Sequence, residues 1–262
     1  MFIRAIKTPV IQPGNDLVQV FLESLEKAGE SLLPGDIVVI AETVMATAQG
    51  RVVDLKSITD PCDEAKEIAK KFNMDPRLVQ IIIAESDEIL GGVDHVILAR
   101  SHGLLLANAG VDASNSGGGT LVSLLPDDLW GSIRQFREEL SKKAAVEPIG
   151  AILADSRVQP LKKGVLGGAL AVSGFVPVED KRGQVDLFGR PLVITQIAVA
   201  DDLTSAAELL MGEANEQTPF VLIREAPVHF ERDDKIDVKS MEMAPDKCLF
   251  MNIFSRYRKE ER

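Results

Sequence analysis

Aromatic residues are scarce in this 262-residue chain, which has one Trp, one Tyr and ten Phe. Proteins that bind single-stranded nucleic acid stack the bases on aromatic side chains, so this scarcity disfavours that class. Positive charge is also in deficit, because the formal net charge is −11. A phosphate backbone requires a basic surface, and we therefore expect no nucleic-acid partner.

Cysteine and long apolar runs are equally scarce. Cys62 and Cys248 have no metal-ligand spacing, and we expect free thiols in a reducing compartment in preference to a lone disulfide. No apolar run approaches the roughly 20 residues that span a bilayer. The first residues have the pattern of a strand and not that of a signal peptide. We therefore expect a cytoplasmic protein without membrane contact.

Segments typical of strands and of helices alternate along the chain. We expect strands at 2–8, 37–40 (ending at 41–43), 95–98, 104–107, 151–153, 193–199 and 220–223. We expect helices at 15–28, 65–72, 78–85, 127–144 and from 201 or 202 to 210. No repeat and no linker interrupts this order, so the pattern predicts one unit of mixed α/β (α+β) class over 1–262, with a charged, frayed tail at 254–262.

Two aspartates carry the strongest functional signal. Asp112 ends one apolar run and is followed by Ser114 and Asn115, and Asp155 ends another and is followed by Ser156. A carboxylate that leaves a buried strand faces the open edge of a sheet. Carboxylate, hydroxyl and amide oxygens suit Mg²⁺ or Mn²⁺ and their phosphates. The pattern indicates a metal-dependent, phosphate-handling enzyme, although for either aspartate alone a turn or a helix cap explains it equally well.

Two further segments are weaker signals. Residues 210–219 lie between a helix and a strand, where Gly212 permits a bend and Glu213 offers a third carboxylate, but solvated acids at a helix end explain them as well. Lys162 and Lys163 fit a solvated turn better than a phosphate site. No Walker loop, dinucleotide fingerprint or nucleophile motif is present, so a bound nucleotide would occupy a non-standard site.

In order and spacing these segments resemble the coenzyme F420-0:L-glutamate ligases, also called gamma-glutamyl ligases, from about residue 8 to 224. The strongest carriers are Asn108–Asn115, Asp186–Arg190 and Leu209–Glu213, with support from Gly50-Arg51 and Glu85-Ser86. The resemblance implies the mixed α/β fold particular to that family. It also implies an intertwined homodimer with its active site near the subunit interface.

The resemblance implies an amide-forming reaction that depends on GTP and metal. GTP would phosphorylate the terminal carboxylate of the deazaflavin coenzyme F420-0, and the amino group of L-glutamate would attack the acyl phosphate, releasing phosphate and GDP. The implied ions are two divalent cations, Mg²⁺ or Mn²⁺, with K⁺ as a further candidate. The alternatives are the same chemistry on another acid and amine in a divergent paralogue, a nucleotide- or deazaflavin-binding protein without catalysis, and a structural dimerisation module.

Position by position, the resemblance assigns a catalytic and metal-binding set. Asp112 and Asp155 would bind the first cation, and Ser156 and Glu213 the second. The residues that it assigns to the nucleotide pocket are Thr8, Pro9, Val10, Ile11, Glu42, Thr43, Thr47, Asn115, Met211, Gly212, Glu213, Ala214 and Asn215.

The chain also departs from the family pattern. Ser156 stands where the family has Thr, Thr47 where it has Lys, Glu42 where it has a small hydroxyl residue, and Arg157-Val158-Gln159 where it has Asn-Gly-Arg. The serine keeps the metal-binding hydroxyl. The metal chemistry is therefore better supported than the identity of the substrates.

Overall fold

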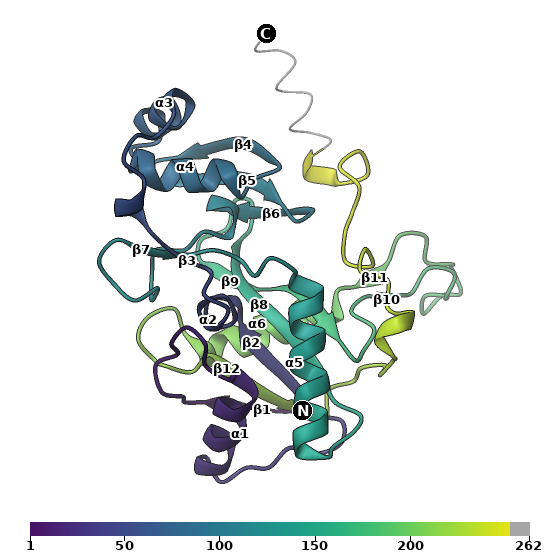
Figure 1. The fold of residues 1–262 in the computed structure, drawn as a ribbon. Coiled ribbons are helices and arrows are strands. Elements are labelled where there is room, and N and C mark those ends of the chain that lie inside the picture. Colours follow the sequence, from purple (N-terminus) through teal and green to yellow (C-terminus); the bar gives the residue numbers. More distant parts are fainter. Residues whose placement is uncertain (252–262) are drawn as a thin grey trace.

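The computed structural model describes residues 1–251, and its largest sheet has five strands in the order β1–β12–β2–β8–β9 (Figure 1). The strands are β1 (Phe2–Ile6), β2 (Ile37–Ala41), β8 (Gly150–Val158), β9 (Val165–Ser173) and β12 (Phe220–Arg224). Within it, β2 and β8 run parallel and the other neighbours antiparallel. The predicted mixed α/β class is thereby confirmed.

Helices cover both faces of this sheet. Helices α1 (Leu17–Lys27) and α5 (Leu129–Ala144) pack on one face, and α6 (Val199–Met211) packs on the other. Phe21 of α1 and Phe136 of α5 meet Phe220 of β12, with ring centroids 5.2 and 6.1 Å from it. Full burial of one such ring stabilises the fold by about 2–3 kcal/mol, so the apolar spacing of these helices fixes their orientation.

Helix α2 (Glu42–Ala48) follows β2 without a connecting loop. The predicted strand at 37–40 is confirmed and ends at Ala41, within the predicted 41–43, but the sequence pattern does not predict the helix that begins at Glu42. No side chain caps the helix, because its N-cap is Ala41, so the sequence lacks the usual start signal. The consequence is functional, since Glu42 and Thr43 occupy the first turn of a helix at the carboxyl end of β2.

A second layer of structure has its own apolar core and lies at the top of Figure 1. It contains α3 (Asp63–Lys71), α4 (Pro76–Ala84), and the sheet β4 (Glu88–Val93), β5 (Val96–Ser101) and β6 (Leu104–Ala107). The antiparallel pair β3 (Val52–Asp54) and β7 (Leu121–Ser123) lies between the two parts in Figure 1. Short 3-10 turns are η1 (Leu55–Ser57), η2 (Asn108–Gly110) and η3 (Asp233–Lys235).

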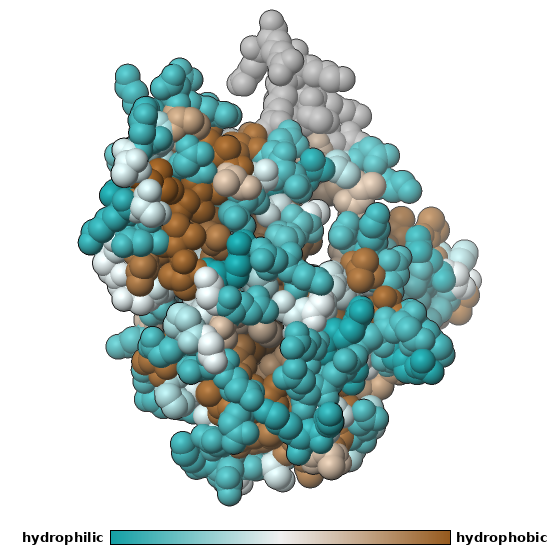
Figure 2. All heavy atoms as spheres, in the orientation of Figure 1, coloured by the Kyte–Doolittle hydropathy of each residue, from teal (hydrophilic) through white to brown (hydrophobic). Residues whose placement is uncertain are grey.

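Residues 179–197 form an arm that is closed at its base by β10 (Glu179–Asp180) and β11 (Gln196–Ile197). The predicted strand at 193–199 is wrong, because Val193 and Ile194 are exposed and only two of these residues pair. Helix α6 begins at Val199, before the predicted start at 201 or 202, so both aspartates lie in its first turn. Apolar side chains lie on the surface of the arm in Figure 2.

Helix boundaries differ slightly from the prediction. Helix α1 begins at Leu17, capped by Asp16, where a helix is predicted from 15, and Cys62 caps α3 through its Sγ. Cys62 and Cys248 are free, as expected. The predicted charged tail at 254–262 lies outside the described residues. Among residues 1–251, no helix has the length and apolar character required to cross a membrane.

Candidate functional site

A cavity of about 540 Å³ lies where the parallel pairing of β2 and β8 ends, beside Ala41 and Ala154. Crevices at this edge of a parallel pair are the usual ligand sites of α/β sheets. All of the residues that the sequence predicts for the site line this cavity: Thr8, Pro9, Val10, Ile11, Glu42, Thr43, Thr47, Asp112, Asn115, Asp155, Ser156, Met211, Gly212, Glu213, Ala214 and Asn215. The structure thus brings together segments that lie more than two hundred residues apart in the sequence.

Asp112 is held by its own backbone and by its neighbours. Its N–H and C=O bond to Ser123 at 3.0 and 2.8 Å, and its carboxylate accepts from the backbone N–H and the hydroxyl of Ser114 at 2.8 and 2.7 Å. Asp112 does not directly follow a strand, which corrects the prediction. The turn η2 lies between β6 and Asp112, and its Ala109 is in the left-handed region at φ 56°. The turn redirects the chain from β6 into the cavity.

Asp155 and Ser156 lie inside β8 and not after it, which is a second correction. The strand continues to Val158 because β9 pairs with it residue by residue, with Asp155 opposite Gly168. The side chains of adjacent strand residues leave opposite faces. Ser156 therefore shares the face of Ile152 and Ala154, which pack in the α6 core, and Asp155 leaves the other face.

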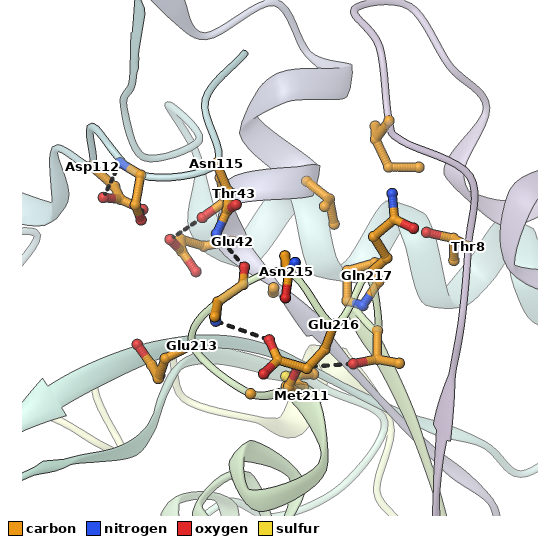
Figure 3. Close-up of a pocket in the computed structure, with 18 of the residues that line it drawn as sticks. Thr8, Glu42, Thr43, Asp112, Asn115, Met211, Glu213, Asn215, Glu216 and Gln217 are labelled. Atoms are coloured by element: carbon orange, nitrogen blue, oxygen red, sulfur yellow. Dashed lines mark hydrogen bonds between the residues drawn. The ribbon is translucent and has the colours of Figure 1, made fainter. Parts of the chain in front are cut away.

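The segment after α6 forms one wall of the cavity (Figure 3). Gly212 has φ 72° and ends the helix, and a Cβ there would lie 2.4 Å from the carboxyl carbon of Glu216. The side-chain amide of Asn115 donates to the carbonyl of Ala214 at 3.0 Å. The N–H of Thr8 donates to the carbonyl of Gln217 at 3.0 Å. These bonds join three separate segments around the cavity.

Carboxylates gather at one end of the cavity without a counter-charge. The residues concerned are Glu42, Asp112, Asp155, Glu208 and Glu213, and none of the described lining residues is Lys, Arg or His. Burial, with the nearby charge of Asp112, raises the pKa of Glu42 to about 7 despite a hydrogen bond from Thr43. Burial, and next the charge of Glu42, raises the pKa of Asp155 well above its usual value.

Glu208 belongs to the same cluster, and burial followed by its contact with Glu213 raises its pKa to about 8. Glu208 is not among the site residues predicted from the sequence. A signal for it exists, because in α6 it lies four residues after Thr204 and three before Met211, both of which are buried. An acid on the buried stripe of a helix needs a partner.

The oxygen donors fit divalent cations. Carboxylates that repel one another in a partly buried site are relieved by a bound cation. Within residues 1–251 no three His, Cys, Asp or Glu side chains are grouped closely enough to cage an ion. A full cage is not required, because Mg²⁺ at phosphate-transfer sites is held by one or two carboxylates together with water and substrate phosphate.

Comparisons with known proteins identify the family. The family model "F420-0:Gamma-glutamyl ligase" matches residues 5–225, close to the predicted range of 8–224. The chain is 40% identical over 227 residues to the coenzyme F420:L-glutamate ligase of Methanothermobacter thermautotrophicus, covering 86% of this chain and 89% of that one. It is 40% identical over 223 residues to the enzyme of that name from Methanopyrus kandleri, covering 85% of each chain.

A third relative, the coenzyme F420:L-glutamate ligase of Methanocaldococcus jannaschii, is 43% identical over 197 residues, covering 75% of this chain and 78% of its own. The resemblance predicted from the short motifs is thereby confirmed, and so is the predicted enzyme class. The chain is a carbon–nitrogen ligase and belongs to the F420-0:gamma-glutamyl ligase family.

Proposed function

We propose that this protein joins L-glutamate to coenzyme F420-0 through an amide bond, at the expense of GTP and with divalent cations. The observation that carries the proposal is the cavity where the parallel pairing of β2 and β8 ends, in which carboxylates converge without a basic residue among the described lining residues. Such a site attracts cations, and cations recruit phosphates. Relatives named coenzyme F420:L-glutamate ligase supply the substrate pair.

The cavity has two chemically different ends, which supports the proposed orientation of the nucleotide. Figure 3 places Asp112, Glu42 and Glu213 on one side and Thr8 and Gln217 on the other. Glu216, drawn between the two sides, also lines the cavity, and the lining further includes the apolar side chains of Val10, Ile11 and Val44. In this orientation the phosphates lie beside Asp112, Glu42 and Glu213, and the nucleoside lies toward Thr8 and Gln217.

The two faces of β8 support the two cation positions that the family resemblance implies. Asp112 and Asp155 would hold one ion, and Ser156 and Glu213 the other. When bound, the ions neutralise and align the transferring phosphoryl group. Ser114 holds the Asp112 carboxylate through two hydrogen bonds, so this ligand is oriented before an ion arrives.

The reaction balances in two steps. A carboxylate oxygen of the acid substrate attacks the γ-phosphorus of GTP, and the bond to the β-phosphate oxygen breaks, which releases GDP. The glutamate nitrogen then attacks the carbonyl carbon of the acyl phosphate, loses a proton, and expels inorganic phosphate with the electron pair of the C–O bond. Positioning and charge stabilisation supply most of the acceleration in phosphoryl transfer. The rigid β8 strand and the hydrogen-bonded walls of the cavity provide that positioning.

The arm supports the proposed homodimer. Leu187, Phe188 and Ile194 are 92%, 81% and 85% exposed, and they lie within 179–197. Large apolar side chains gathered on one projecting segment are typical of a protein interface. A second copy of the chain is the partner that we propose for the arm.

Mass spectrometry of the reaction products tests the proposed function. Purified protein is incubated with F420-0, L-glutamate, GTP and Mn²⁺, and we expect product that is one glutamyl unit heavier, formed only when GTP and metal are both present. Asp155→Asn removes a carboxylate charge with little change of volume, and we expect at least a 100-fold loss of activity. Glu64→Gln, which neutralises an exposed carboxylate on helix α3, is the matched control.

Three results would contradict parts of the proposal. Nucleotide consumption without glutamyl product would indicate a ligase for another acid and amine. Absence of both would favour the non-catalytic binding protein. Full activity of Asp155→Asn would remove this residue from the site.

A further inference from the structure

Arg157 lies two residues after Asp155 in β8, in a stretch where the pairing with β9 is regular. Side chains two residues apart leave the same face of a strand, about 7 Å from each other. Arg157 is therefore the basic residue of β8 on the face that carries Asp155, and it is not itself among the residues that line the cavity.

The packing of Arg157 depends on a glycine. A Cβ built on Gly168 of β9 would lie 2.8 Å from Cδ and 3.2 Å from Nε of Arg157. The missing side chain at Gly168 thus makes room for the arginine stem, which lies over the edge strand of the sheet. Any larger residue at this position would displace the arginine.

The guanidinium of Arg157 has unused hydrogen-bonding capacity. Its Nε is buried and has no hydrogen-bond partner among residues 1–251. Its Nη1 lies 3.5 Å from Oδ2 of Asp201, longer than a charge-assisted hydrogen bond of about 2.7–2.9 Å. The other oxygen of Asp201 already accepts from the N–H of Ala169 at 3.0 Å. A buried donor without a partner in a native structure calls for a ligand or another explanation.

The charges of the substrates supply a reason for this arginine. The described lining residues of the cavity include carboxylates and no basic side chain, so nothing there attracts a free carboxylate. Cations balance the nucleotide phosphates, but L-glutamate brings two carboxylates of its own. An amino acid that delivers its nitrogen to this site needs a cationic group close to the reacting centre.

We propose that Arg157, which stands where the family has Asn, binds a carboxylate of the amino-acid substrate in this chain and so contributes to its preference for an acidic amino acid. The planar guanidinium can hold a carboxylate through two parallel hydrogen bonds, which also fixes the direction of the attached nitrogen. The weak contact with Asp201 gives way to the substrate carboxylate. This inference rests on the proposed function, because it assigns the residue that recognises one of its substrates.

Steady-state kinetics of Arg157→Ala tests the inference. The KM values for L-glutamate, GTP and F420-0 are measured separately, with product identified by mass. We expect the KM for L-glutamate to rise roughly 10- to 100-fold, the effect of losing hydrogen bonds to a charged group, and the other two KM values to stay within about twofold. Wild-type preference for L-glutamate over uncharged L-glutamine should shrink by a similar factor.

Two further variants sharpen the experiment. Arg157→Lys keeps the charge but loses the paired hydrogen bonds, and its KM for L-glutamate should fall between those of the wild type and Arg157→Ala. It also carries the test if Arg157→Ala does not fold. Arg232→Ala removes an exposed arginine paired with Asp234 and should leave all three KM values unchanged.

Three outcomes would overturn the inference: an unchanged KM for L-glutamate, an equal rise of all three KM values, or a rise confined to F420-0. If the wild-type protein forms no glutamyl product, the proposed function fails instead. The two failures are therefore distinguishable, because only the second is visible without any variant.

Discussion

At the scale of single residues, the site is defined by carboxylates that the folded chain forces together. Glu42 is 7% exposed, and its pKa is raised from 4.5 to about 7 mainly by burial. In metal-free protein between these pH values the folded state keeps a proton that the unfolded state has lost. The free energy of unfolding therefore falls as pH rises from about 4.5 to 7, by about 1.4 kcal/mol for each unit of pKa difference.

Glu42→Gln should remove this penalty. With a chelator present, the free energy of unfolding of the wild type should fall between pH 5 and pH 8. In the variant we expect this fall to be smaller by roughly 2–3 kcal/mol. Urea titrations at the two pH values measure it, and Glu64→Gln serves as the exposed control. An identical pH dependence in wild type and variant would mean that Glu42 ionises freely in the folded protein.

At the scale of elements, the sequence predicts the long periodic helices α1 and α5 and the buried strands β2 and β12. It predicts less well where pairing decides the outcome. The strand at 151–153 extends to Val158 only because β9 lies beside it, and a glycine-rich stretch becomes β9 for the same reason. Asp112 and Asp155 are predicted from the sequence pattern and most other cavity residues from the family motifs, whereas Glu208 is recognised only from its place on α6 and its contact with Glu213.

The arm is the element with the clearest testable role outside the site. Phe188→Asp places a charge on a side chain that is 81% exposed in the single chain, so its own folding should be unaffected. If the arm packs against a second copy, the charge is buried there without a partner, and we expect the dimer to dissociate. Sedimentation velocity measures the oligomeric state, with Leu161→Asp, also exposed, as control. A monomeric wild type, or a variant that remains dimeric, would refute this role.

At the scale of the whole molecule, the five-stranded sheet, helix α6 and the loop from the second apolar core meet around one cavity. The sheet supplies Asp155 and Ser156, α2 supplies Glu42, the loop supplies Asp112, and α6 supplies Glu208. Because separate parts of the fold each contribute a carboxylate, the site forms only when they are docked. A cation bound among them should therefore also stabilise the folded protein.

The central claim is that the protein activates a substrate carboxylate by phosphorylation. Transfer of ¹⁸O from the carboxylate of labelled F420-0 tests this claim most directly. The phosphorylated carboxylate oxygen leaves with phosphate when the amine attacks, so the account predicts one ¹⁸O atom in the inorganic phosphate for each amide formed. Phosphate without ¹⁸O, released alongside glutamyl product, would contradict the account, because the carboxylate would then have been activated in another way.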